Sequence, residues 1–216
     1  MTENNRTEAF IRSFDLPGPE YLNEIEKEAK RDRVPIIRPA SQSLLKLLLA
    51  MKKPETILEI GTATGFSAIL MAEYTGNDCQ ITTIEKYEKR IPIAKKNFLK
   101  SGFKDRIRLL EGDAYDIIKD LAEEGKSYDL IFLDAAKAQY IVYLPVLLKL
   151  MKRGSLLISD NVLQDGEIIE SRFAVTRRNR TIHSRMREYL YEISHNEELV
   201  TDILPIGDGM TVSVKL

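Results

Sequence analysis

The chain reads Ile57-Leu58-Glu59-Ile60-Gly61-Thr62-Ala63-Thr64-Gly65-Phe66-Ser67 where an apolar run breaks into a turn of small residues. The apolar run predicts a buried parallel strand, and the segment after the turn predicts a helix. Glycine at positions 61 and 65 permits a sharp turn and a close approach of the backbone to a ligand. Open α/β sheets bind their ligands at this edge, so the stretch predicts both a fold class and a site.

Four more apolar runs follow along the chain, separated by segments with helical spacing. They cover residues 81–84, 107–110, 130–133 and 156–158. This alternation predicts an α/β fold with a doubly wound, mostly parallel sheet. Two further runs, 199–204 and 211–214, flank the turn Pro205-Ile206-Gly207-Asp208-Gly209. They predict a C-terminal antiparallel hairpin and a sheet of seven strands.

The first ~50 residues predict helices rather than strands. Residues 20–31 and 41–52 carry apolar side chains at helical spacing, and prolines 35 and 39 require an extended segment between these helices. We expect the second helix to pack Leu44, Leu45, Leu47, Leu48 and Met51. The chain is therefore expected to form one domain, 1–216, with a helical N-terminal segment (1–53) before an α/β core (54–216).

The composition, 44% hydrophobic and 30% charged in 216 residues, is typical of a soluble globular protein. No apolar stretch reaches the length of a membrane span, and the N-terminus lacks the layout of a signal peptide. Cys79 is the single cysteine, which excludes an internal disulfide and favours the cytoplasm. With only His183 and His195, a zinc site is disfavoured. The net charge of −1 restricts any nucleic-acid surface to a local patch.

Acidic residues follow the second and third predicted strands. Glu85 comes about 20 residues after Gly65, where such folds place an acid on the ribose hydroxyls of a nucleotide cofactor. Asp113, in Gly112-Asp113-Ala114, suits the N-cap of the next helix. The spacing Glu59-x-Gly61-x-Ala63-x-Gly65 differs from the Gly-x-Gly-x-x-Gly of hydride-transferring enzymes, which disfavours an NAD-dependent oxidoreductase.

Oxygen ligands lie at the ends of the fourth and fifth predicted strands, which we expect to be neighbours. Asp134 follows one strand, and Asp160 and Asn161 follow the other. Two carboxylates and an amide suit Mg²⁺, or Mn²⁺ in its place, rather than Zn²⁺. A cation near Lys137 is expected to lower the pKa of that amine, so that its neutral form serves as a base. The alternatives are a plain turn at Asp160-Asn161 and a solvated Lys137.

Together these motifs resemble the S-adenosylmethionine-dependent, metal-assisted O-methyltransferases of the catechol and caffeoyl-CoA type. The resemblance rests on Asp134-x-x-Lys137-x-x-Tyr140, the later Asp160-Asn161, and a Glu/Asp-x-Gly-x-Gly-x-Gly signature whose middle glycine is Ala63. It extends from about Val34 to Gly209. It implies a class I methyltransferase fold, which is Rossmann-like, with Mg²⁺ on Asp134, Asp160 and Asn161 and with Asp134 and Lys137 as catalytic residues.

The resemblance also implies how S-adenosylmethionine is held. Asp113 and Ala114 would lie at the adenine, and Ile37 would contact the cofactor through its backbone. Ser67, near a helix N-terminus, would bond the methionine carboxylate with help from the helix dipole. The full set of expected cofactor-binding residues is Ile37, Glu59, Gly61, Gly65, Ser67, Glu85, Asp113, Ala114 and Asp134.

An arginine-rich segment without acidic residues follows the predicted metal ligands. Its arginines are Arg172, Arg177, Arg178, Arg180, Arg185 and Arg187. Arginine suits contacts to phosphates and stacking on unpaired bases, which favours RNA as the acceptor over a merely solvated helix face. With Val34-Pro35-Ile36, Asp160-Asn161-Val162-Leu163 and the turn 205–209, the chain most resembles bacterial tRNA 5-hydroxyuridine methyltransferases. That subgroup makes 5-methoxyuridine at the wobble position of the anticodon.

Two other functions fit parts of the sequence. A small-molecule O-methyltransferase acting on catechols or hydroxycinnamoyl thioesters would share every cofactor and metal residue, and only the arginines argue against it. A non-catalytic RNA-binding protein would not need the acids and the lysine that this chain retains. The resemblance also implies a homodimer, for which Phe10, Ile11 and Phe14 are suited, although they would equally cover the chain's own sheet.

Overall fold

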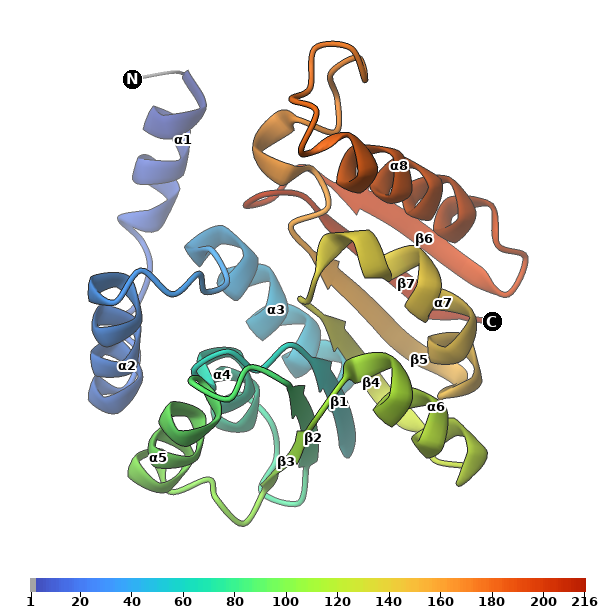
Figure 1. The fold of residues 1–216 in the computed structure, drawn as a ribbon. Coiled ribbons are helices and arrows are strands. Elements are labelled where there is room, and N and C mark those ends of the chain that lie inside the picture. Colours follow the sequence, from blue (N-terminus) through green and yellow to red (C-terminus); the bar gives the residue numbers. More distant parts are fainter. Residues whose placement is uncertain (1–2) are drawn as a thin grey trace.

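The computed structural model of the chain describes residues 3–216. Its centre is a seven-stranded sheet in the order β3-β2-β1-β4-β5-β7-β6, covered by helices on both faces (Figure 1). The strands are β1 (Thr56–Ile60), β2 (Gln80–Glu85), β3 (Ile107–Glu111), β4 (Tyr128–Leu133), β5 (Met151–Asp160), β6 (Leu199–Leu204) and β7 (Met210–Lys215). Only β7 runs antiparallel to its neighbours, β5 and β6. The predicted fold class, C-terminal hairpin included, is confirmed.

The helices form two layers. One contains α2 (Glu20–Arg31), α3 (Pro39–Lys52), α4 (Phe66–Glu73) and α5 (Ile91–Ser101), and the other contains α6 (Ala114–Glu123), α7 (Tyr140–Lys149) and α8 (Arg180–His195). Short 3₁₀ helices, η1 (Lys137–Gln139) and η2 (Gln164–Gly166), follow β4 and β5. Figure 1 shows α1 (Glu3–Arg12) standing apart from both layers. None of the described helices has the length and apolar character to span a bilayer.

Alternate residues of the central strands face opposite helical layers. On β1, Ile57 packs in the cluster that contains Leu45 and Phe98, whereas Leu58 packs in the cluster that contains Leu144. All of these side chains are buried. Burial on both faces is the reason why parallel strands appear in the sequence as continuous apolar runs.

Some boundaries and packing expectations were wrong. Strand β5 begins at Met151, because a polar stretch before the apolar run also pairs, with a register shift between Tyr128 and Leu130 of β4. Helix α8 begins at Arg180, because residues 176–179 form a turn. Leu47 and Met51 were expected to pack but are 56% and 73% exposed, since α3 buries its Leu45 and Leu49 face instead.

The order in which consecutive strands are added to the sheet reverses between β1 and β4. These two strands are parallel neighbours, so their carboxyl ends lie side by side. Gly61, directly after β1, has φ +102°, and a Cβ built there would lie 2.0 Å from the backbone oxygen of Asp134. Only glycine permits this approach, because any side chain would push the two strand ends apart. This switch point is where doubly wound sheets bind ligands.

We predict that Gly61→Ala destabilises the chain more than Gly102→Ala. Both glycines have positive φ, but a Cβ at Gly102 meets nothing within 4 Å. Each variant should lose roughly 1–2 kcal/mol from the backbone conformation, and Gly61→Ala roughly 1–3 kcal/mol more from overpacking. Chemical denaturation of both variants measures the difference. Equal losses would contradict the proposed crowding between β1 and β4.

Candidate active site

A cavity of about 550 Å³ opens at the carboxyl ends of β1, β2, β4 and β5. Its walls come from the segment before α3, the turn after β1, the loop after β4 and the start of η2. The predicted site residues that line it are Ile37, Gly61, Ser67, Glu85, Ala114, Asp134, Lys137 and Asn161. Glu59, Gly65, Asp113 and Asp160 do not line the cavity, and each lies behind or beside a residue that does.

Glu85 fixes the turn that forms the floor of the cavity. One carboxylate oxygen, Oε2, accepts the backbone N–H of Ala63 at 2.8 Å. The other, Oε1, accepts the N–H groups of Lys86 at 2.9 Å and Tyr87 at 2.8 Å. The Glu85 carboxylate, which we expected to bind a ribose, therefore holds the turn after β1 and the segment after β2 in place. Ala63 itself has φ +47°, so the alanine in the signature adopts the left-handed conformation of the glycine it replaces.

Glu59 is fully buried beneath this turn. It accepts a hydrogen bond from Thr83 Oγ1, while its other oxygen has no protein partner. Burial raises the pKa of Glu59 to about 7, although the neighbouring hydroxyls of Ser67 and Thr83 favour its charged form. Its link to the cavity therefore runs through Ser67, which does line it.

The other expected cofactor residues also have structural roles. Asp113 caps α6 by accepting the N–H of Tyr115 at 2.9 Å, and its other oxygen pairs with Lys86 at 3.2 Å. The Ile37 carbonyl accepts Nε2 of Gln42 at 3.0 Å, so one of its backbone groups is already engaged. Ala114 remains on the cavity wall.

Asp134, Asp160 and Asn161 come together as predicted. Asn161 Nδ2 donates to Asp134 Oδ1 at 3.1 Å, and Asn161 has φ +59°. Asp160 is 1% exposed, and its Oδ1 accepts Ser41 Oγ at 3.2 Å whereas Oδ2 has no partner. Burial and the nearby charge of Asp134 raise the pKa of Asp160 to about 6. The unpartnered oxygen belongs to a buried carboxyl group that forms no salt bridge among the described side chains, and the nearby Lys137 offsets its raised pKa only in part.

This donor set fits a hard divalent cation. No group of three His, Cys, Asp or Glu side chains that could hold a metal occurs among the described residues, so a third protein ligand would come from another residue type, such as the Asn161 amide. Two carboxylates and an amide are ligands that Mg²⁺ and Mn²⁺ accept. A cation there would satisfy the free oxygen of Asp160 and offset the repulsion between the two carboxylates.

Lys137 lies beside this pair. Its Nζ donates to Asp134 Oδ1 at 2.8 Å, to the Tyr140 hydroxyl at 2.9 Å and to the Asp160 carbonyl at 3.3 Å. Burial lowers the pKa of Lys137, but Tyr140 and Asp134 outweigh it, and the net pKa is raised. These acceptors were not evident from the sequence, and the pKa of Lys137 beside a cation stays a prediction.

Several residues at the site were not predicted from the sequence. Arg38, before α3, pairs with Asp165 of η2 and lies 3.8 Å from Asp208, while Asp208 accepts the N–H of Asp165. All three line the cavity, and Ser41 from α3 reaches Asp160. These contacts join three segments at the cavity mouth. The sequence indicated only one of these residues, Asp208, as an acid between two glycines in the turn 205–209.

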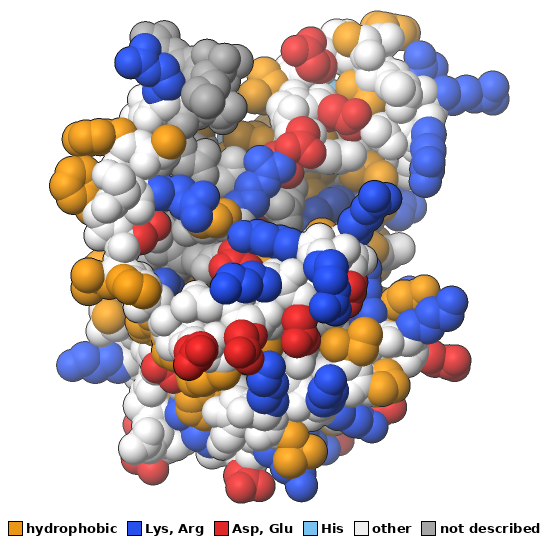
Figure 2. All heavy atoms as spheres, turned by 90° about the vertical axis from the view of Figure 1, so that its left-hand side faces the viewer, with side chains coloured by type: hydrophobic (Ala, Val, Ile, Leu, Met, Phe, Trp, Pro, Cys, Tyr) orange, Lys and Arg blue, Asp and Glu red, His pale blue; other side chains and the backbone are white. Residues whose placement is uncertain are grey.

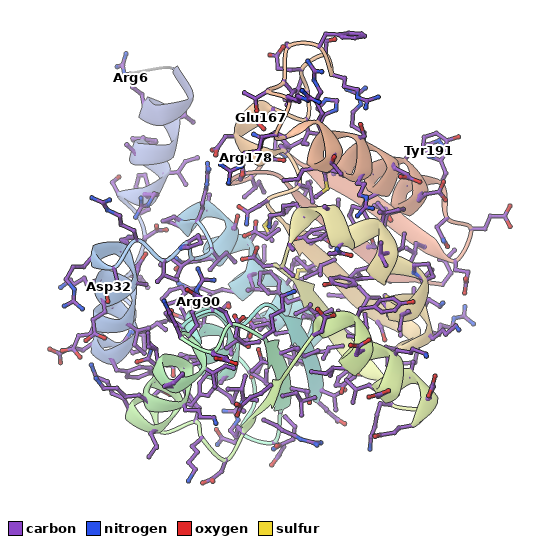
Figure 3. All side chains as sticks on the ribbon, viewed as in Figure 1. Arg6, Asp32, Arg90, Glu167, Arg178 and Tyr191 are labelled. Atoms are coloured by element: carbon purple, nitrogen blue, oxygen red, sulfur yellow. The ribbon has the colours of Figure 1, made fainter. Side chains whose placement is uncertain are left out.

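The six predicted RNA-binding arginines divide into two groups. Arg180, Arg185 and Arg187 donate to the backbone carbonyls of Val175, Ala138 and Ile168, respectively. Arg172, Arg177 and Arg178 are exposed, and no described acidic side chain pairs with them. Figure 3 shows Arg178 and Glu167 on the side of their loop that faces α3.

Comparisons with known proteins agree with this geometry. A family model described as O-methyltransferase matches residues 12–216. A catechol O-methyltransferase from Niastella koreensis is 34% identical over 135 residues, 62% of this chain and 61% of that protein. Caffeoyl-CoA O-methyltransferase 1 from Eucalyptus globulus is 33% identical, covering 78% of this chain and 70% of that one. An O-methyltransferase from Bacillus cereus in complex with SAH superposes with TM-score 0.86 and 25% identity, covering 98% and 97%.

The fold and the site therefore define a class I methyltransferase. The chain belongs to the O-methyltransferase family, whose matched model covers most of its length, and the relatives named above are catechol and caffeoyl-CoA O-methyltransferases.

We predict that Asp160→Asn stabilises the cation-free chain at pH 7.5. The folded pKa of about 6 lies above the ordinary value of 3.8, so the folded form binds the proton more tightly. The wild-type chain accordingly loses stability as pH rises between these values, by up to about 3 kcal/mol. The variant should melt at a higher temperature than wild type at pH 7.5 and show little difference at pH 4.

Mg²⁺ should then raise the melting temperature of the wild type but not that of Asp160→Asn, because the variant has lost an anionic ligand. Asp105→Asn, at an exposed position, is the matched control and should behave as wild type. A lower melting temperature for Asp160→Asn than for wild type without cation would contradict the claim that the buried Asp160 carboxylate destabilises the fold.

Proposed function

We propose that the chain methylates 5-hydroxyuridine at the wobble position of a tRNA anticodon, forming 5-methoxyuridine. S-adenosylmethionine would be the methyl donor and Mg²⁺, or Mn²⁺, the metal. One observation carries the choice of acceptor: Arg172, Arg177 and Arg178 project unpaired from the loop that begins at the candidate metal ligands. Figure 2 shows further Lys and Arg side chains across the face that carries the N-terminal helices.

The site residues suit methyl transfer to a vicinal oxygen pair. The 5-hydroxyl and O4 of the base form such a pair, as the two oxygens of a catechol do. A divalent cation on Asp134, Asp160 and Asn161 would lower the pKa of the hydroxyl and, by charge repulsion, that of Lys137. Lys137 would then take the hydroxyl proton on Nζ, while Tyr140 holds this amine in place. The oxygen attacks the methyl carbon in line, and the neutral thioether leaves.

The substrates in the names of the relatives favour a different acceptor, a catechol or a caffeoyl thioester. A small acceptor would bind inside the cavity and would have no use for arginines on an exposed loop. An anticodon loop presents unpaired bases and phosphates at once, which would suit a cavity followed along the chain by a loop with unpaired arginines.

We predict that replacing Arg172, Arg177 and Arg178 with serine weakens methylation of tRNA but spares methylation of catechol. Loss of three phosphate contacts should raise KM for tRNA by at least about tenfold at moderate salt. The control removes three exposed cations elsewhere, Lys126, Lys149 and Arg153. Steady-state assays of both variants on both acceptors provide the comparison. Equal effects on tRNA and catechol, or none on tRNA, would support the small-molecule reading.

We further propose a cytoplasmic homodimer formed through the exposed apolar side chains of the N-terminal region. Phe10, Ile11 and Phe14 are 66%, 60% and 71% exposed, and Leu47 and Met51 of α3 are also exposed. Figure 2 shows hydrophobic side chains exposed along the left edge of this face. Such side chains are costly to leave in water. Cys79 is free and buried, in keeping with a reducing compartment.

Replacing Phe10 and Phe14 with serine should convert this dimer into a monomer in sedimentation velocity, because the variant loses apolar area at the contact. The matched variant Leu99→Ser, at an exposed position on α5, should leave the dimer intact. A wild-type chain that sediments as a monomer would refute the dimer.

A further inference from the structure

One aromatic side chain stands out from the loop between η2 and α8. Phe173 is 89% exposed, although the same loop buries Ile168 and Val175. The loop is well ordered by hydrogen bonds: Asn179 Nδ2 donates to both carboxylate oxygens of Glu167 at 3.0 and 2.8 Å, and Ala174 N donates to the Ser171 carbonyl at 2.9 Å. The loop thus buries two of its apolar side chains, Ile168 and Val175, and leaves the Phe173 ring exposed to solvent.

The ring stands in basic surroundings. Arg172 adjoins it in the sequence, and Arg177 and Arg178 follow within five residues, none of them paired with a described acid. An isolated exposed phenylalanine is common on protein surfaces. A solvent-exposed ring among unpaired arginines has the composition of a surface that binds single-stranded nucleic acid, where bases stack on aromatic rings and arginines contact the phosphates.

The position of the loop relates the ring to the active site. Asp165 lines the cavity, and Phe173 follows it by eight positions in the sequence. The ring is therefore at most about 28 Å from the cavity wall. This reach suits a base that neighbours the reacting one rather than the reacting base itself.

We propose that Phe173 stacks on an unpaired base flanking the target nucleotide, with Arg172, Arg177 and Arg178 on the adjacent phosphates. The proposal rests on RNA being the acceptor and adds a residue that selects an unpaired loop. Phe173 is a binding residue and touches no reacting atom.

Because the chain contains no tryptophan, Phe173→Trp creates a single fluorescent reporter. We expect an unmodified anticodon stem-loop RNA to quench this tryptophan on binding, since stacking brings a base onto the indole. Tyr191→Trp, on the opposite part of α8 from the loop in Figure 3, is the matched reporter and should not be quenched. RNA binding, followed independently by gel shift, without selective quenching at position 173 would overturn the proposal.

A kinetic comparison tests the consequence for catalysis. Phe173→Ala should raise KM for a stem-loop carrying 5-hydroxyuridine by about 5- to 150-fold with kcat unchanged. Phe173→Tyr, which keeps a stacking ring, should restore KM, and the free nucleoside 5-hydroxyuridine should react equally with all three chains. An unchanged KM for Phe173→Ala would refute the stacking role.

The outcomes separate this inference from the proposed function. A wild-type chain that methylates the stem-loop while Phe173→Ala does so equally well leaves the function standing and removes the stacking role. A wild-type chain that neither binds nor methylates the RNA removes both. A shift of Phe173→Trp emission with protein concentration alone would assign the ring to a contact between two copies of the chain and overturn the RNA role.

Discussion

The close approach of β1 and β4 at their carboxyl ends is the constraint on which the site depends. Gly61 allows the turn after β1 to pass against the backbone of Asp134. This contact places the cofactor turn beside the first candidate metal ligand, and the pairing of β4 with β5 adds Asp160 and Asn161. A wider spacing would separate the methyl donor from the oxygen it must reach, and in-line transfer tolerates little displacement.

Charge is incompletely balanced at this edge. Asp160 is buried with one free oxygen, and Lys137 is the only cation that touches Asp134 among the described side chains. A buried carboxylate without an ion-pair partner destabilises a fold. Proteins therefore keep such a group mainly where function requires it. The pKa of Lys137 is raised, despite its burial, by its contacts with Tyr140 and Asp134. Whether Lys137 can accept a proton thus depends on the charges of the groups around it, Asp134 and Tyr140 among them.

The sequence predicted the elements whose signals are local. Strands β1 to β4 were evident because burial on both faces requires continuous apolar runs, and the convergence of Asp134 with Asp160 followed from adjacent parallel strands. The link of Ser41 to Asp160 and that of Arg38 to Asp165 were not predicted, because each joins residues more than a hundred positions apart. The contact of Lys137 with the Asp160 carbonyl was not predicted for the same reason, since that carbonyl comes from another strand. Exposure of Leu47 and Met51 could not be read from helical periodicity, which does not say what covers a face.

The central claim is cation-dependent methyl transfer from S-adenosylmethionine to an oxygen of the wobble base. The most direct measurement incubates the chain with labelled S-adenosylmethionine and tRNA containing 5-hydroxyuridine, with Mg²⁺ or with a chelator, and analyses the digested nucleosides. The account predicts labelled 5-methoxyuridine with Mg²⁺ and none with the chelator. Label that appears in catechol but not in tRNA, or transfer to tRNA that persists in the chelator, would contradict it.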